Sequence, residues 1–132
     1  MGYEMRFYVV NKHDFKGYKD NEGNEYKYGN IIAMYDYSKD YDLADFIDKN
    51  GKPTDCYIFA NDRENETIKD SYGEHLKEIT VDKLLDYLEQ NPCYSYRRYA
   101  PFMYLLRAFK EIQDDEENNP KFEDLVVLRY GY

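Results

Sequence analysis

The chain has 132 residues, and its 27 Asp and Glu outnumber its 18 Lys and Arg, so the formal charge at pH 7 is −9. This length suits a single domain, residues 1–132, and this charge argues against direct contact with nucleic acid or an anionic membrane, which would repel the chain. The mean hydropathy of −0.94 is typical of disordered chains, but 17 Tyr and 7 Phe supply aromatic surface that such chains lack, so we expect a folded protein.

A hairpin and a short helix are predicted in the first third of the chain. Residues 5–10 and 31–37 are rich in β-branched and aromatic side chains, which predicts two strands. The polar turn residues 21–24 lie between them and favour an antiparallel hairpin. Apolar side chains recur at helical spacing over residues 42–49, and Gly51 ends this predicted helix.

The middle of the chain predicts short strands and a second helix. Residues 56–60 are a compact apolar run, which is typical of a buried strand, and residues 61–66 are a solvated loop. Residues 67–69 and 75–79 predict two short strands. A helix with an apolar stripe follows, and Thr80 is its predicted N-cap.

The segment 94–112 has the longest apolar face of the sequence and predicts the helix on which the core is built, with Pro101 in its first turn. Residues 125–130 are apolar at nearly every position, which predicts a strand at the centre of a sheet. These elements predict an α+β fold, with a mixed, mainly antiparallel sheet of about four to six strands and two to three helices packed on one face. The stripe of the large helix consists of Phe102, Leu105, Leu106, Phe109 and Ile112.

The sequence contains no recognisable catalytic or metal-binding motif, so a non-enzymatic protein without cofactor or metal is expected. Cys56 and Cys93 are too few for a disulfide framework, and together with His13 and His75 they lack the spacing of zinc ligands. Cys56 lies within an apolar run, which predicts a buried and inert thiol. Neither a signal peptide nor a membrane-spanning segment is recognisable, so the expected location is cytoplasmic.

Acidic side chains cluster around the short helix, in the middle loop and after the large helix. On a helix, Asp42, Asp45 and Asp48 would follow one another at a rise of about 4.5 Å, similar to the spacing of phosphates along a nucleic-acid strand. A row of this kind fits a basic groove on a nucleic-acid-binding protein, whereas the alternative is an ordinary solubilising surface. The predicted partner-binding residues are Asp36, Tyr37, Asp40, Tyr41, Asp42, Asp45, Asp48, Asp114, Asp115, Glu116 and Glu117.

Many tyrosines lie beside polar residues, which predicts several exposed phenol rings of the kind found at protein interfaces. The alternative is that the rings fill the core and leave their hydroxyl groups at its rim. Arg97 and Arg98 also have two interpretations, since they could pair with nearby carboxylates or contact an anionic ligand. The rings expected to be exposed are those of Tyr35, Tyr37, Tyr41, Tyr94, Tyr96, Tyr99, Tyr130 and Tyr132.

The sequence therefore predicts a non-catalytic acidic binding protein whose partner is a basic protein surface, such as that of a nucleic-acid-binding protein. No motif assigns the chain to a family. Its size, acidity and tyrosine content are similar to those of many small phage and mobile-element proteins, some of which inhibit host nucleases or defence complexes, as anti-CRISPR and antirestriction proteins do. Two alternatives are a self-assembling structural protein with tyrosine-mediated subunit contacts, hence a homo-oligomer, and a small metal-dependent enzyme with a dispersed carboxylate site.

Overall fold

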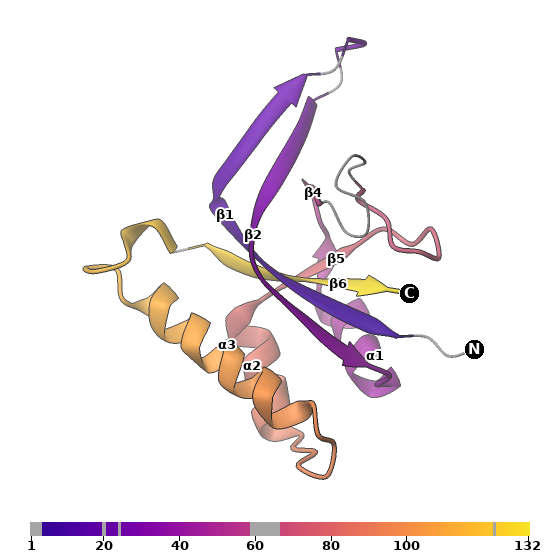
Figure 1. The fold of residues 1–132 in the computed structure, drawn as a ribbon, viewed down its shortest axis with the longest axis vertical. Helices are drawn as coiled ribbons and strands as arrows, with labels where there is room; N and C mark the ends of the chain where they lie inside the picture. Colours follow the sequence, from indigo (N-terminus) through magenta and orange to yellow (C-terminus); the bar gives the residue numbers. More distant parts are fainter. Residues whose placement is uncertain (1–3, 20, 24, 59–66, 123) are drawn as a thin grey trace.

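The chain folds around a β-sheet with helices packed against it (Figure 1). The structure is a computed structural model that describes residues 4–19, 21–23, 25–58, 67–122 and 124–132. In chain order its elements are β1 (Met5–Lys19), β2 (Glu25–Ser38), α1 (Tyr41–Asn50), β3 (Lys52–Pro53), β4 (Cys56–Tyr57), β5 (Lys77–Thr80), α2 (Val81–Gln90), α3 (Tyr99–Asp114), the 3₁₀ helix η1 (Pro120–Phe122) and β6 (Leu125–Gly131).

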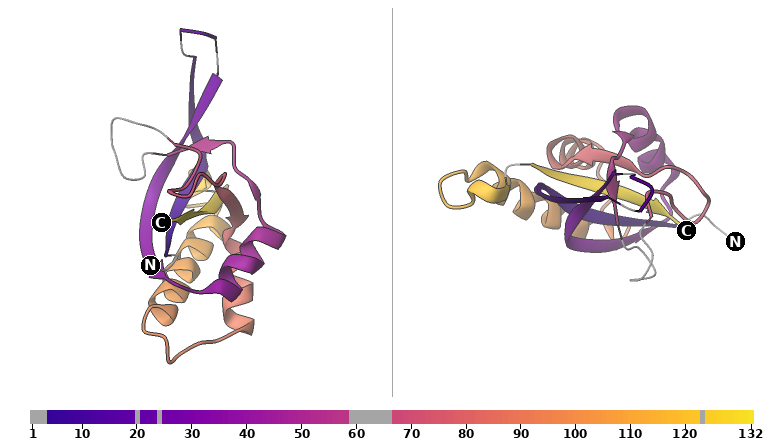
Figure 2. Two further views of the ribbon diagram at one scale, coloured as in Figure 1. Left: turned by 90° about the vertical axis from the view of Figure 1, so that its right-hand side faces the viewer. Right: turned by 90° about the horizontal axis from the view of Figure 1, so that it is seen from above.

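Within the described residues, six strands form one sheet in the order β3-β5-β6-β1-β2-β4. All neighbours are antiparallel except β2 and β4, which run parallel over two residue pairs. Strands β1 and β2 form the predicted hairpin, and its far end extends beyond the rest of the molecule (Figure 2). The α+β fold class, with a mixed and mainly antiparallel sheet, is therefore confirmed.

Strand β6 lies between β5 and β1, so the prediction that it is central and apolar on both faces is confirmed. Its side chains alternate between two hydrophobic clusters, because successive residues of a strand point to opposite faces. Leu125 and Val127 join the larger cluster on the helix side, and Val126 and Leu128 join a smaller cluster on the other face.

The larger cluster is built between the sheet and all three α-helices of the described chain. Thr80 caps α2 as predicted, because its side chain accepts a hydrogen bond from the backbone N–H of Lys83 at 3.2 Å. Phe102 of α3 is fully buried and stacks between the rings of Phe7 and Tyr35, at centroid distances of 4.7 and 5.2 Å. The helix predicted from the longest apolar stripe therefore supplies the centre of this core.

The smaller cluster covers the opposite face of the sheet and contains Cys56, which is buried as predicted. The predicted strand 56–60 is observed as β4. Residues 59 and 60 of this prediction, and the predicted loop 61–66, lie outside the described residues. The two short predicted strands appear as isolated bridges, Ile58 to Thr67 and Lys69 to His75, and as strand β5.

Buried phenols make the protein sensitive to alkaline pH. Tyr37 is 1% exposed, and burial raises the pKa of its phenol above the usual value of about 10. The unfolded chain loses this proton near pH ~10 while the folded chain keeps it, so the free energy of unfolding falls above that pH by about 1.4 kcal/mol per pH unit for each such group. We expect urea unfolding at increasing alkaline pH to show this fall.

Tyr37→Phe keeps the buried ring and removes the ionising group, so we expect its stability to fall less steeply between about pH 10 and 11 than that of the parent chain. Tyr8 and Tyr99, whose phenol pKa values are also raised by burial, are among the groups that would contribute to the dependence that remains. Equal slopes for the two proteins would contradict the assignment to Tyr37.

Candidate functional site

The acidic residues predicted to bind a partner form two separate groups in the structure. Residues 36–48 lie on and before α1, and residues 114–117 lie at the end of α3. The two segments are at opposite sides of the molecule in Figure 1, and the view from above in Figure 2 separates them in the same way. The two groups therefore do not form a single surface.

Helix α1 presents the predicted row of carboxylates. Asp42, Asp45 and Asp48 are exposed, while Leu43 and Ile47 on the other side of the helix are buried. Asp48 forms an ion pair with Arg129 of β6, so this carboxylate also serves to attach α1 to the sheet. Among the described residues, no basic partner is recorded for Asp42 or Asp45, and these two carboxylates are available to a binding partner.

Asp40 has a structural role that the sequence analysis did not assign. Its carboxylate accepts a hydrogen bond from the backbone N–H of Leu43 at 3.1 Å and thereby caps the N-terminus of α1. A carboxylate at this position also interacts favourably with the positive end of the helix dipole. Asp40 thus fixes the start of the helix, and the sequence pattern of an Asp three residues before an inward-facing apolar residue was the available signal.

A groove runs beside α1, between this helix and the turn at residues 70–74, and has a volume of about 630 Å³. Four carboxylates line it and outnumber its basic side chains, so the groove is acidic. The phenol rings of Tyr41 and Tyr72 are 63% and 56% exposed, which makes them the aromatic contact surface of the groove. The lining residues are Tyr41, Ala44, Asp45, Asp48, Asp70, Tyr72, Glu74, His75, Lys77 and Arg129.

The turn that forms the second wall of this groove is held by Asp70. Its Oδ1 atom accepts hydrogen bonds from the backbone N–H groups of Tyr72 and Glu74, at 2.9 and 3.0 Å. Gly73 has φ +79°, a left-handed conformation that glycine adopts without steric cost. Asp70 and Gly73 were signals for a turn, but nothing local in the sequence indicated that this turn faces α1.

Two predicted contact residues lie on β2, and the structure gives both of them contacts within the fold. Tyr37 is buried in the larger cluster, where its ring packs edge-on against Phe102. Asp36 forms an ion pair with Arg6 at 2.6 Å, and its backbone carbonyl accepts a hydrogen bond from Arg98 at 2.6 Å. Tyr37 is therefore a core residue, while Asp36 stays exposed beside its ion pair. Arg98 contacts a backbone carbonyl and not one of the carboxylates that were predicted as its partners.

The acidic residues after α3 are bound locally or fully exposed. Asp114 forms an ion pair with Lys110 at 3.2 Å, one helical turn earlier. Asp115 accepts hydrogen bonds from the backbone and side chain of Asn118. Glu116 and Glu117 are exposed. None of these side chains lines the acidic groove, and they therefore serve as a control surface for it.

Burial separates the tyrosines into two kinds. The predicted exposure of Tyr41 and Tyr94 is confirmed. The predicted exposure of Tyr37, Tyr99 and Tyr130 is wrong, because these rings are at most 5% exposed. Their hydroxyl or backbone groups form hydrogen bonds at the edge of the core. The Tyr99 hydroxyl, for example, donates a hydrogen bond to the backbone carbonyl of Leu88. The remaining three predicted rings, those of Tyr35, Tyr96 and Tyr132, are partly buried.

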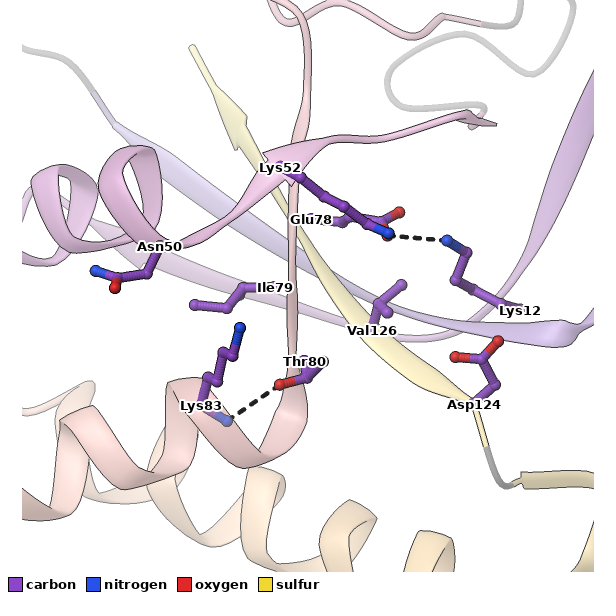
Figure 3. Close-up of a pocket in the computed structure, with 9 residues that line it drawn as sticks. All are labelled: Lys12, Asn50, Lys52, Glu78, Ile79, Thr80, Lys83, Asp124 and Val126. Atoms are coloured by element: carbon purple, nitrogen blue, oxygen red, sulfur yellow. Dashed lines mark hydrogen bonds and ion pairs between the residues drawn. The ribbon is translucent and has the colours of Figure 1, made fainter.

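A second concave site lies at the edge of the sheet, where β3 stops pairing with β5, and has a volume of about 430 Å³ (Figure 3). Its floor contains Glu78, which is 3% exposed and accepts hydrogen bonds from Lys12 at 2.8 Å and from the Thr54 hydroxyl at 2.7 Å. The other lining residues are Asn50, Lys52, Ile79, Thr80, Lys83, Asp124 and Val126. No local sequence pattern marks this site, since its charged residues come from separate parts of the chain.

Burial by itself lowers the pKa of Lys12, but its hydrogen bond to Glu78 and the charges of Glu78 and Asp55 outweigh burial, so the pKa of this ammonium is raised. Lys52 also lies 3.5 Å from the same carboxylate oxygen. Glu78 thus holds the ammonium group of Lys12 from β1, and that of Lys52 from β3 lies close to the same carboxylate.

Comparison with known proteins finds no matching family model, no similar curated protein and no similar solved structure. Among the described residues, no three His, Cys, Asp or Glu side chains converge as a metal site would require. In the same part of the chain, no helix has both the length and the apolar character needed to cross a bilayer.

Proposed function

We propose that the chain is a non-catalytic binding protein whose acidic groove beside α1 binds a basic surface of another protein. The observation that supports this most directly is the meeting of exposed carboxylates and exposed tyrosines on one concave surface. Asp45 and Asp48 come from α1, while Asp70 and Glu74 come from the facing turn. A partner segment in the groove would thus have carboxylates on both sides.

The charges of the groove favour a partner rich in Lys and Arg. A protein of net charge −9 attracts such a partner at long range, and the exposed carboxylates of Asp42 and Asp45 add to this field beside the groove. The rings of Tyr41 and Tyr72 offer large contact area together with a polar hydroxyl, a combination enriched at interfaces. They also present π faces on which a guanidinium or ammonium group is stabilised.

The partner class that fits this surface best is a protein that binds nucleic acid through a basic groove. Asp42 and Asp45 are successive members of the helical row, at a rise of about 4.5 Å, which is of the same order as the phosphate spacing of a nucleic-acid strand. Occupation of a basic groove by this row would exclude nucleic acid from it. The proposed biological role is accordingly that of an inhibitor of a nucleic-acid-processing protein, such as a host nuclease or defence complex targeted by phages and mobile elements.

The test is capture of partners from the source cell by the immobilised chain, with two variants of equal charge. Asp42→Lys/Asp45→Lys reverses the exposed row and leaves the Asp48–Arg129 ion pair intact. Glu116→Lys/Glu117→Lys makes the same charge change at the opposite side of the molecule. We expect the first variant to lose at least about tenfold in captured partner and the second to lose less than about twofold, because the effect depends on position as well as on net charge.

Two further measurements define the partner. Capture should fall between about 50 and 200 mM salt, since the screening length shortens over this range, and an added oligonucleotide should displace the partner by competing for its basic groove. Equal capture by the parent chain and the Asp42→Lys/Asp45→Lys variant would contradict the proposed site. Capture that an oligonucleotide leaves unchanged would contradict the nucleic-acid-binding class of the partner.

A further inference from the structure

We propose that the lysine-lined pocket at the edge of the sheet is a binding site for a phosphate group of a small molecule. This proposal is independent of the acidic groove, which lies elsewhere on the chain and shares no residue with the pocket. In a protein with an excess of acidic residues, three lysines from three different elements line one concave site. They are Lys12 of β1, Lys52 of β3 and Lys83 of α2.

The ammonium group of Lys12 is held in place before any ligand binds, and that of Lys52 lies beside it. The buried carboxylate of Glu78 accepts from Lys12 at 2.8 Å and lies 3.5 Å from Lys52 through the same oxygen. Its second oxygen is held by the Thr54 hydroxyl at 2.7 Å, and that hydroxyl in turn accepts from the backbone N–H of Cys56. A carboxylate fixed on both oxygens keeps the position of Lys12 defined, so less conformational entropy of this side chain is lost when a ligand binds.

Lys83 extends from the first turn of α2 toward Ile79, on the side of β5 opposite Lys12 and Glu78 (Figure 3). Among the described residues, no carboxylate partner is recorded for its ammonium group. The N-terminus of α2 adds the positive end of a helix dipole beside it, and Thr80, the cap of this helix, also lines the pocket. The pocket therefore has the fixed ammonium group of Lys12 and the exposed one of Lys52 on one side of β5, and on the other side the ammonium group of Lys83, which is available to a ligand.

The charge balance of the pocket favours an anion of the phosphate class. Three lysines line it against two carboxylates, Glu78 and Asp124. Glu78 is turned into the protein by its hydrogen bonds, so Asp124 is the exposed carboxylate of the lining that would oppose an anion. Lysine ammonium groups bind phosphate as point charges, and a volume of about 430 Å³ accommodates a phosphate together with the small organic group that carries it.

The experiment uses the full chain and inorganic phosphate as the probe. The thermal unfolding midpoint is measured at pH ~8 over a phosphate titration, with sodium chloride added to keep the ionic strength constant. We expect a saturable rise in the midpoint with phosphate. Lys83→Met should weaken the apparent affinity about tenfold by removing a charge-assisted hydrogen bond, whereas Lys49→Met, on the exposed surface of α1 and outside the pocket, should leave it unchanged.

Asp124→Asn is expected to change the phosphate affinity in the opposite direction. It should strengthen binding, because it removes the exposed carboxylate of the lining. Both pocket variants change exposed side chains, so their midpoints without phosphate should stay close to that of the parent. Three results would each overturn the proposal: no rise with phosphate beyond that of the matched chloride series, equal affinities of Lys83→Met and the parent chain, or an equal loss of affinity in Lys49→Met.

Discussion

Phe102→Ala is expected to lower the free energy of unfolding by about 3–5 kcal/mol, the usual cost of removing a fully buried aromatic ring. Phe102 is 0% exposed and stacks against Phe7 and Tyr35 at interplanar angles of 17° and 13°. Its ring also meets Tyr37 edge-on at 5.3 Å. Alanine would remove all three contacts and leave a cavity between α3 and strands β1 and β2, and these rigid elements would not close it.

Tyr104→Ala is the matched control for this prediction, because it removes an aromatic ring from the same helix where the ring is 60% exposed. Its recorded contact is with the guanidinium of Arg107, which contributes at most about 1 kcal/mol at an exposed site. Urea unfolding followed by circular dichroism measures both variants. A loss of less than about 2 kcal/mol in Phe102→Ala would show that the core is not centred on this ring.

The helices and the central strand could be predicted because their signals are local. Thr80 and the apolar stripe behind it lie within one short segment, so the cap and the buried face of α2 follow from spacing alone. Strand β6 is apolar at successive positions, which a strand tolerates only when both of its faces are covered. In these cases no knowledge of distant contacts was needed.

The burial of the tyrosines was misjudged because residues beside polar neighbours were taken to be exposed themselves. In a strand, neighbours point to opposite faces, so the exposed Asp36 places Tyr35 and Tyr37 on the covered face. Both rings pack beneath α3. The alternation Tyr35-Asp36-Tyr37 was therefore the available signal, and it favours the interpretation in which tyrosines fill the core.

The acidic groove was only half predictable. The row on α1 follows from helical spacing, but its facing wall depends on the pairing of β5 with β6. That pairing sets Lys77 opposite Arg129, which in turn forms the ion pair with Asp48. Contacts between residues separated by so much sequence are fixed by strand order and register, which one sequence does not reveal. The lysine pocket depends on the same non-local pairing, since β3, β5 and β1 each contribute to it.

Removal of the buried carboxylate is the second large effect, and we expect Glu78→Ala to cost about 3 kcal/mol of stability. Glu78 is 3% exposed, and the side chain of Lys12 beside it is 16% exposed, so this ion pair is shielded from solvent. Without the carboxylate, Lys12 keeps the more distant and more exposed Asp55 at 3.5 Å, and the Thr54 hydroxyl loses its acceptor. Lys52→Ala should cost less than about 1 kcal/mol, because this partner of Glu78 is largely exposed.

The double variant Lys12→Met/Glu78→Leu separates the value of the pair from the cost of breaking it. If most of the loss in Glu78→Ala comes from leaving a shielded ammonium without its nearest carboxylate, two apolar side chains of similar size should recover most of the stability. A double-mutant cycle of urea unfolding measures the coupling between the two positions. A double variant as unstable as Glu78→Ala would instead assign the loss to Thr54 and the packing around it. Recovery of stability with loss of phosphate binding would show that the ion pair is retained for the pocket and not for the fold.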